Sequence, residues 1–179
     1  MSIQEQATST AIPVGTWLVD PVHSSIGFAI RHNTVTTFRG KVGAFDVQLT
    51  DGRLEGTAKV SSIEVEDENL TGHLQTPDFF DAEQFPELRF VSSRIERDGD
   101  RLSVAGDLTI RGTTASVELS GSISGPVDDA YGKERVGLDL ETTVNRHDFG
   151  VSWNAELPGG GTMLEDDVTI TASLALVRV

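Results

Sequence analysis

Apolar and polar residues alternate along most of this chain, a pattern typical of β-strands that bury one face. Near the N-terminus, Ile26, Phe28 and Ile30 alternate with small or polar residues. His32 continues the same phase, which predicts that its side chain points inward and that the side chain of Arg31 points outward. An inward histidine is then either a hydrogen-bonded core residue or a polar contact for a ligand.

The same alternation predicts about eight strands, separated by hairpin signals such as Asp51-Gly52 and Asp98-Gly99. The Gly125-Pro126 pair is expected to end one of them. The expected strands are residues 25–32, 36–49, 54–65, 88–97, 101–111, 116–124, 135–144 and 168–177. Eight strands with one apolar face each close most simply into an antiparallel barrel, because closure removes exposed edges. A β-sandwich is the alternative that periodicity leaves open.

One segment breaks the alternation. Residues 70–86 contain leucines and phenylalanines grouped between turn residues, and Pro77 and Pro86 limit any helix there to a short piece. These bulky side chains must be buried somewhere, and the flank or mouth of a barrel is a natural place for them. We therefore expect a short helical connection near residues 70–86.

The N-terminal residues differ in pattern from the rest of the chain. Residues 1–13 are polar and lack periodicity, which predicts a flexible N-terminal tail. No internal repeat or change of composition divides the remainder, so residues 14–179 are predicted to form a single domain.

The composition narrows the possible function classes. With 14 Lys and Arg against 28 Asp and Glu, the 179 residues carry a formal net charge of −14. This balance argues against nucleic-acid binding and against a polybasic membrane anchor. The absence of Cys excludes disulfides and thiolate metal sites. No apolar run approaches the ~20 residues of a membrane span and no secretory signal is recognisable, so we expect a cytoplasmic protein.

Motifs for catalysis or for metal and cofactor binding are weak. The chain has four histidines, at positions 23, 32, 73 and 147, without metal-ligand spacing, and it has no nucleophile-elbow motif. Runs of carboxylates such as residues 165–167 are typical of solvated loops. We therefore expect no cofactor, no metal and no catalytic residue. The phenylalanines, leucines and isoleucines instead favour a tunnel for an elongated apolar ligand with one polar end.

Several sequence blocks occur in an order that is similar to one known family. The blocks are DPVHSSIGFAIRH (20–32), FRGKVGAFD (38–46), HLQTPDFFDAEQFPELRFVSS (73–93), GDLTIRGTTASVEL (106–119), NRHDFGV (145–151) and EDDVTI (165–170). From Trp17 to the C-terminus, the chain resembles the YceI-like family of polyisoprenoid-binding proteins. The resemblance implies a lipocalin-like antiparallel barrel whose long apolar pore holds a polyisoprenoid chain. It also implies a binding or carrier protein, commonly a dimer, without established catalysis.

The resemblance also implies a set of ligand-binding residues. They are Phe28, Ile30, His32, Phe38, Phe45, Phe79, Phe80, Phe90 and Phe149, with Arg146 and His147 near the head group. To these we add two residues that share the apolar face of the strand expected at 135–144, namely Leu138 and Leu140.

Three functions are compatible with these residues. The first is a carrier or sequestering protein for a long isoprenoid lipid, such as an isoprenoid quinone or a polyprenyl compound. It would be a homodimer that contacts a membrane transiently to load its ligand. The second is an enzyme that acts on a bound apolar substrate, with His32 or His147 as general base. The third is a structural or stress-response protein with a filled barrel.

Overall fold

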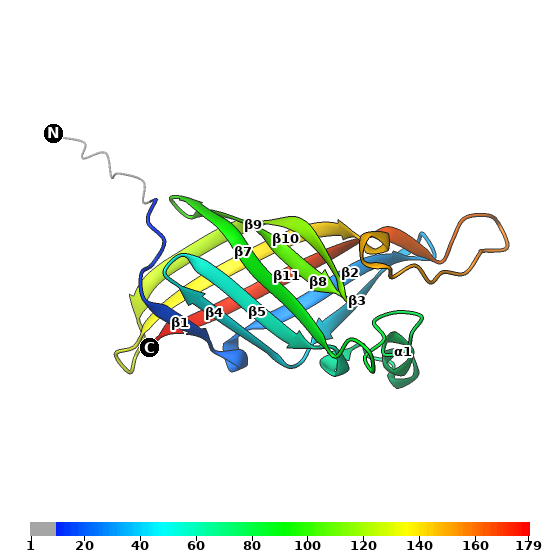
Figure 1. Ribbon diagram of the computed structural model, residues 1–179, viewed down its shortest axis with the longest axis horizontal. Helices are drawn as coiled ribbons and strands as arrows, with labels where there is room; N and C mark the ends of the chain where they lie inside the picture. The colour runs from blue at the N-terminus through cyan, green and yellow to red at the C-terminus, as the bar shows by residue number, and fades with distance from the viewer. Residues whose placement is uncertain (1–9) are drawn as a thin grey trace.

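Strand pairing runs around a closed ring in the computed structural model of the protein, which describes residues 10–179. The ring follows the order β1-β4-β5-β7-β8-β9-β10-β11, and β11 pairs back onto β1 (Figure 1). Every pairing in this ring is antiparallel. The predicted eight-stranded antiparallel barrel is therefore confirmed, and the sandwich alternative is wrong. Residues 1–9 of the predicted N-terminal tail lie outside the described residues.

Each predicted strand is found, but those expected at residues 36–49 and 54–65 are each divided in two, and the strand at Thr16–Val19 was not among the predictions. The strands are β1 (Thr16–Val19), β2 (Ser25–His32), β3 (Thr36–Val42), β4 (Phe45–Thr50), β5 (Arg53–Lys59), β6 (Ile63–Glu64), β7 (Glu87–Asp98), β8 (Arg101–Ile110), β9 (Thr113–Asp128), β10 (Glu134–Asn145) and β11 (Leu164–Arg178). The helical elements are α1 (Glu68–Leu74) and the short 3-10 helices η1 (Pro21–His23), η2 (Val60–Ser62) and η3 (Arg146–Phe149).

Three long strands of the barrel are each interrupted once. The 3-10 helix η1 separates β1 from β2, two residues separate β3 from β4, and η2 separates β5 from β6. The second and third interruptions lie side by side, because Gly43 N donates to Ser62 O at 2.9 Å and Lys59 N donates to Ala44 O at 2.9 Å. On one side of these breaks β1 and β4 complete the ring, and on the other the wall continues as β11-β2-β3-β6.

Two strands extend several residues beyond the sequence prediction. Strand β9 continues through Gly125-Pro126 to Asp128, because its register against β10 shifts between Arg135 and Gly137 and so accommodates the irregular residues. Strand β11 begins at Leu164 instead of residue 168, across a second register shift opposite β2. A local signal such as Gly125-Pro126 shows where a strand can end. Whether the strand instead continues through a bulge depends on its register against the neighbouring strand.

The helix α1 begins at Glu68, slightly before the predicted segment, because the carboxylate of Asp67 caps it by accepting from Leu70 N at 2.9 Å. The rest of the connection, 75–86, is formed of turns. Gln75 fastens it to the barrel by donating from Nε2 to Val60 O at 2.9 Å and to Ile63 O at 3.3 Å. No helix within residues 10–179 is long and apolar enough to cross a membrane.

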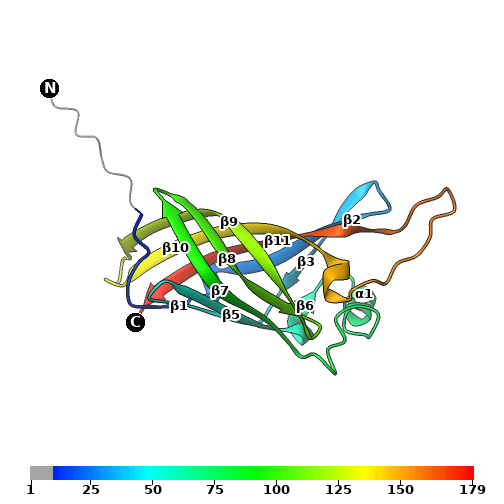
Figure 2. The same cartoon turned by 45° about the horizontal axis from the view of Figure 1, so that its top comes forward.

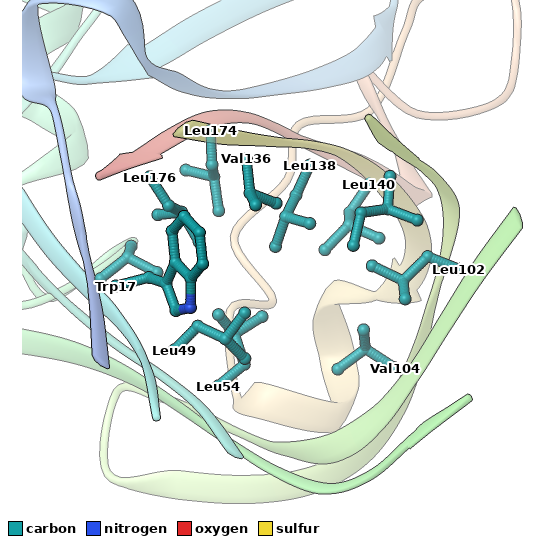
Figure 3. Packing of buried hydrophobic residues seen from close by; sticks show 12 residues of the cluster. Trp17, Leu49, Leu54, Leu102, Val104, Val136, Leu138, Leu140, Leu174 and Leu176 are labelled. Atoms are coloured by element: carbon teal, nitrogen blue, oxygen red, sulfur yellow. The ribbon is translucent and has the colours of Figure 1, made fainter. Parts of the chain in front are cut away.

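The interior divides into two apolar clusters along the barrel. We call the first the packed end: it centres on Trp17, which is 1% exposed, and on leucines and valines that point toward it from the surrounding strands (Figure 3). We call the second the cavity end: it includes Ile30, Leu74 and Phe149. Both ribbon views place α1 and the loop between η3 and β11 at the end of the molecule opposite β1 and the C-terminus (Figures 1 and 2).

Candidate functional site

A cavity of about 460 Å³ lies at the cavity end of the barrel. This volume falls within the range of about 300–1,000 Å³ that is usual for ligand sites. Its lining is dominated by aliphatic and aromatic side chains from the strands and from the segments that cover the end of the barrel. The packed end closes the cavity on one side, because its side chains fill the barrel there.

Strand alternation explains most of the lining. Inward positions of β2, β10 and β11 pair across the sheet, so that Phe28 faces Ile170 and Leu140 faces Ala172. These residues all contact the cavity. Their outward neighbours, such as Arg31, are exposed. The predicted orientations of His32 and Arg31 are both confirmed, because His32 contacts the cavity and Arg31 is exposed.

Two irregular segments meet over the cavity through aromatic rings. The ring of His73, on α1, lies 4.9 Å from that of Phe79 and 5.1 Å from that of Trp153, both in edge-to-face geometry. Phe79 and Trp153 are themselves 5.3 Å apart. His73 Nε2 also forms a 2.9 Å hydrogen bond with Asp78 Oδ2, which orients the imidazole. The connection after α1 therefore forms part of the cavity wall, as the sequence predicted.

The 3-10 helix η3 sends two of its residues inward and leaves two outside. In a 3-10 turn, residues three apart share a face, so Arg146 and Phe149 are both buried while His147 and Asp148 are exposed. His147 Nε2 bonds instead to Asp166 Oδ1 at 2.7 Å on the outer surface. This local geometry separates the two residues that were predicted to lie near a head group.

Arg146 fastens the loop that covers the cavity. Its Nη1 donates to the carbonyl oxygens of Val151 and Trp153 at 2.8 Å each, and its Nε donates to Glu165 O at 2.9 Å. Burial lowers the pKa of Arg146, an effect that the negative charge of Asp166 partly opposes. One guanidinium nitrogen, Nη2, is buried without a hydrogen-bond partner.

The structure brings most of the predicted ligand-binding residues to the cavity. The residues in its lining are Phe28, Ile30, His32, Phe38, Phe79, Phe80, Phe90, Leu140, Arg146 and Phe149. Three others lie elsewhere. Phe45 packs between the two apolar clusters, Leu138 is 2% exposed within the packed end, and His147 is on the surface. Leu138 has the inward phase of its strand, but it lies at a level of the barrel where side chains fill the interior.

The sequence prediction missed other lining residues. Val168 and Ile170 lie on the predicted inward face of the last strand, and Thr142 lies on the predicted inward face of β10. The alternation of inward and outward residues could therefore have identified all three as lining residues. His73 and Trp153 come from irregular segments, where no periodicity indicates which side chain is inward. Within residues 10–179, no group of three His, Asp or Glu side chains is arranged to hold a metal ion.

An eight-stranded antiparallel barrel with one filled end and one apolar cavity has the architecture of lipocalin-like ligand-binding barrels. A sequence model of the YceI-like domain matches residues 17–176, and the chain therefore belongs to the YceI-like family. The UPF0312 protein of Staphylococcus epidermidis is 36% identical over 166 residues, which are 86% of this chain and 92% of that relative.

Solved structures of similar fold agree with this assignment. The crystal structure of Burkholderia cenocepacia BcnA superposes with a TM-score of 0.75 at 22% identity, covering 88% of this chain and 98% of that one. A polyisoprenoid binding domain from Saccharophagus degradans, implicated in plant cell wall breakdown, superposes with a TM-score of 0.70 at 10% identity. That match covers 93% of this chain and all of the other. At these identities the likeness concerns the fold.

Proposed function

We propose that the protein binds a long apolar isoprenoid lipid, such as an isoprenoid quinone or a polyprenyl compound, and carries or sequesters it in the cavity. The observation that carries this proposal is the apolar cavity of about 460 Å³, closed at one end by a packed core. Burial of apolar surface contributes roughly 25 cal/mol per Å², so a long chain gains affinity mainly through contact area. The polyisoprenoid binding domain of similar fold supports this ligand class.

The ligand is proposed to lie along the barrel with its tail toward the packed end. Ile26, Leu140 and Leu174 line that part of the cavity and offer only apolar contact. The polar end of the lipid then lies under α1 and the loop that precedes β11. The alternative, a structural protein, would have a barrel filled by side chains along its whole length. Only the packed end is filled in this way.

The direct test is extraction of the purified protein with organic solvent, followed by mass spectrometry of the extract. An isoprenoid lipid in stoichiometric amount is the expected result. Protein stripped of lipid should also bind added isoprenoid quinones or polyprenols, as measured by tryptophan fluorescence. The proposal is overturned if no apolar compound is recovered and none of the added lipids binds.

A blocking substitution tests whether the cavity itself is the binding site. Ala172 lines the cavity and pairs with Ile26 and Leu140 on its two sides, so Ala172→Trp should fill the space and abolish lipid binding. Ala105→Trp is the matched control. Ala105 alternates with the buried residues of β8, and its side chain therefore lies on the outer face. Equal lipid binding by the two variants, both folded by circular dichroism, would show that the ligand binds elsewhere.

The proposed role is binding without chemical turnover. Lipid recovered after incubation with the protein should therefore be chemically unchanged. Conversion of an added prenyl quinone, lost in the His32→Ala variant, would instead support an enzyme.

We also propose that the carrier acts as a cytoplasmic homodimer that contacts membranes transiently to load its ligand. The homodimer follows from the resemblance to the YceI-like family. Sedimentation equilibrium measures the oligomeric state directly, and a monomer at micromolar concentration would contradict the proposal.

Transient membrane contact is tested separately with a fluorescent prenyl lipid in vesicles. The expected result is transfer of the lipid from the vesicles to the protein, without stable co-flotation of protein and vesicles.

A further inference from the structure

Two turns lie side by side at the cavity end of the molecule. The first joins β2 to β3, and the second lies in the loop between η3 and β11. A hydrogen bond from Asn33 N to Met163 O, 2.8 Å long, holds them together. Both ribbon views place these turns at the end opposite β1, with the second turn extending beyond α1 (Figures 1 and 2). We call residues 33–36 and 157–163 the tip.

The tip carries no charged side chain. None of its residues is Asp, Glu, Lys or Arg, although 23% of the whole chain is charged, so the net charge of −14 belongs entirely to the rest of the protein. Within the tip, Val35 is 73% exposed and Leu157 is half-buried. Exposed apolar side chains on an uncharged surface suit the boundary between lipid head groups and acyl chains better than they suit water.

The tip is continuous with the lining of the cavity. Met163 belongs to the tip and lines the cavity as well. His32, which precedes the first turn, and Leu164, which follows the second, are also lining residues. A lipid that leaves a bilayer beneath the tip would therefore meet the apolar lining without first crossing water.

Exposed apolar side chains also occur at the packed end, but in a charged setting. Val22 is 83% exposed and Tyr131 is 91% exposed. Each lies two residues from a carboxylate, Asp20 and Asp129 respectively, and both carboxylates accept from Arg135. A membrane that covered this surface would have to desolvate these charges, and the interior behind it is filled by side chains. The tip, in contrast, combines exposed apolar residues with a direct route to the cavity.

We propose that the tip is the surface that docks on a lipid bilayer, with Val35 and Leu157 in the interfacial region of neutral, zwitterionic phospholipids. This inference rests on the proposed function and assigns the membrane contact to one end of the barrel. Glu156 and the carboxylates of residues 165–167 lie next to the tip in the chain, so an anionic bilayer should repel it. Docking should therefore be weaker on anionic than on neutral vesicles, and added salt should reduce the difference.

The first experiment determines which end contacts the bilayer, and it needs no ligand. Because the chain has no Cys, Val35→Cys and Val22→Cys each accept a single environment-sensitive fluorophore. With phosphatidylcholine vesicles at millimolar lipid, the emission of the label at position 35 should shift to the blue, and that of the label at position 22 should not. Equal shifts at both positions, a shift at position 22 alone, or no shift at either would overturn the proposed docking surface.

The second experiment separates docking from ligand binding. In Val35→Glu the rate at which a fluorescent prenyl lipid moves from phosphatidylcholine vesicles to the protein should fall about tenfold, which is roughly the value of burying one valine side chain. The affinity for the same lipid added from ethanol should not change, because Val35 lies outside the cavity lining. Val22→Glu is the matched control and should keep both the rate and the affinity. An unchanged rate in Val35→Glu, or an equal loss of affinity, would contradict a docking role.

The docking surface and the proposed function can fail separately. Wild-type protein that takes up prenyl lipid neither from vesicles nor from ethanol would overturn the proposed function, while the two fluorophores would still report on the tip. Wild-type protein that binds the lipid but takes it up faster from vesicles containing phosphatidylglycerol than from pure phosphatidylcholine would overturn docking through an uncharged tip. Slower uptake from the anionic vesicles, with a difference that shrinks as salt is raised, is the expected result.

Discussion

The packed end and the cavity end of the barrel are built from the same sheet, yet one is solid and the other is hollow. At the packed end, Trp17 fills the centre of a ring of leucines and valines, and its Nε1 donates to Val14 O at 3.0 Å. At the cavity end, large side chains such as Phe28 and Phe149 lie against the wall and leave about 460 Å³ between them. The difference teaches that strand alternation supplies an apolar interior, whereas the elements covering each end decide whether it is filled.

The covering elements differ in kind. The packed end is completed by β1 and β4, which carry Trp17 and Leu49 into the centre. The cavity end is completed by α1, by η3 and by the loop that Arg146 holds in place. The helix α1, the connection after it and the loop pack on one another through the rings of His73, Phe79 and Trp153.

The largest expected effect comes from removing the central side chain of the packed end. Trp17→Ala should lower the free energy of unfolding by about 3–5 kcal/mol, because Trp17 is fully surrounded and its neighbours cannot collapse into the space. Phe80→Ala at the cavity end should cost clearly less, since Phe80 is half-buried and one side already faces the cavity. Urea denaturation measures both losses. Equal losses would remove the distinction between the two ends.

A smaller effect is expected from adding one methyl group at each end. At Gly121 a Cβ would overlap the backbone oxygen of Asp139, so Gly121→Ala should cost roughly 1–3 kcal/mol in stability. At Gly40 a Cβ would meet the far end of the Phe28 ring, which lines the cavity and therefore has space beside it. Gly40→Ala should therefore change lipid affinity more than the thermal midpoint, and the reverse result would contradict this account.

Acid should weaken a polar network near the packed end. Arg135 donates to Asp129 at 2.7 Å and to Asp20 at 2.8 Å. The hydrogen bond from Arg135 lowers the pKa of Asp129 from 3.8 to about 2, and Arg135 followed by His23 holds the pKa of Asp20 well below its usual range.

Since folding lowers the pKa of both carboxyls, the stability that they contribute is complete above about pH 4 and is lost as the pH falls toward 2. Thermal midpoints of the wild type and of Arg135→Gln, measured between pH 6 and pH 2, provide the check. The two curves should converge at low pH. A difference that stays constant over this range would show that Arg135 acts through packing alone.

The smallest effect is expected at His147, the surface neighbour of Arg146. His147→Gln should change stability by no more than about 0.5 kcal/mol, because the side chain is 43% exposed and its partner Asp166 is solvated. Lipid affinity should also be unchanged. A loss of binding comparable to that of Ala172→Trp would show that the ligand reaches the outer face of η3.

Much of the fold and part of the site could be predicted from the residues alone. The phase that places Phe28, Ile30 and His32 on one face requires only the two-residue period of a strand. The continuation of β9 beyond Pro126 could not be predicted, because it depends on a register shift in β10. Leu138 shows the same limit for the site. Strand alternation predicted that its side chain points inward, but not that it lies in the packed end of the barrel.

The sequence by itself determined that the chain forms antiparallel strands with one apolar face and that residues 70–86 cover them, because these features follow from local periodicity and turn residues. Only the tertiary structure decided where the interior is filled and where it is hollow. Packing depends on which side chains meet at each level of the barrel, and these come from strands and loops far apart in the chain. His73, Arg146 and Trp153 contact one cavity for that reason, although no pattern along the chain connects them.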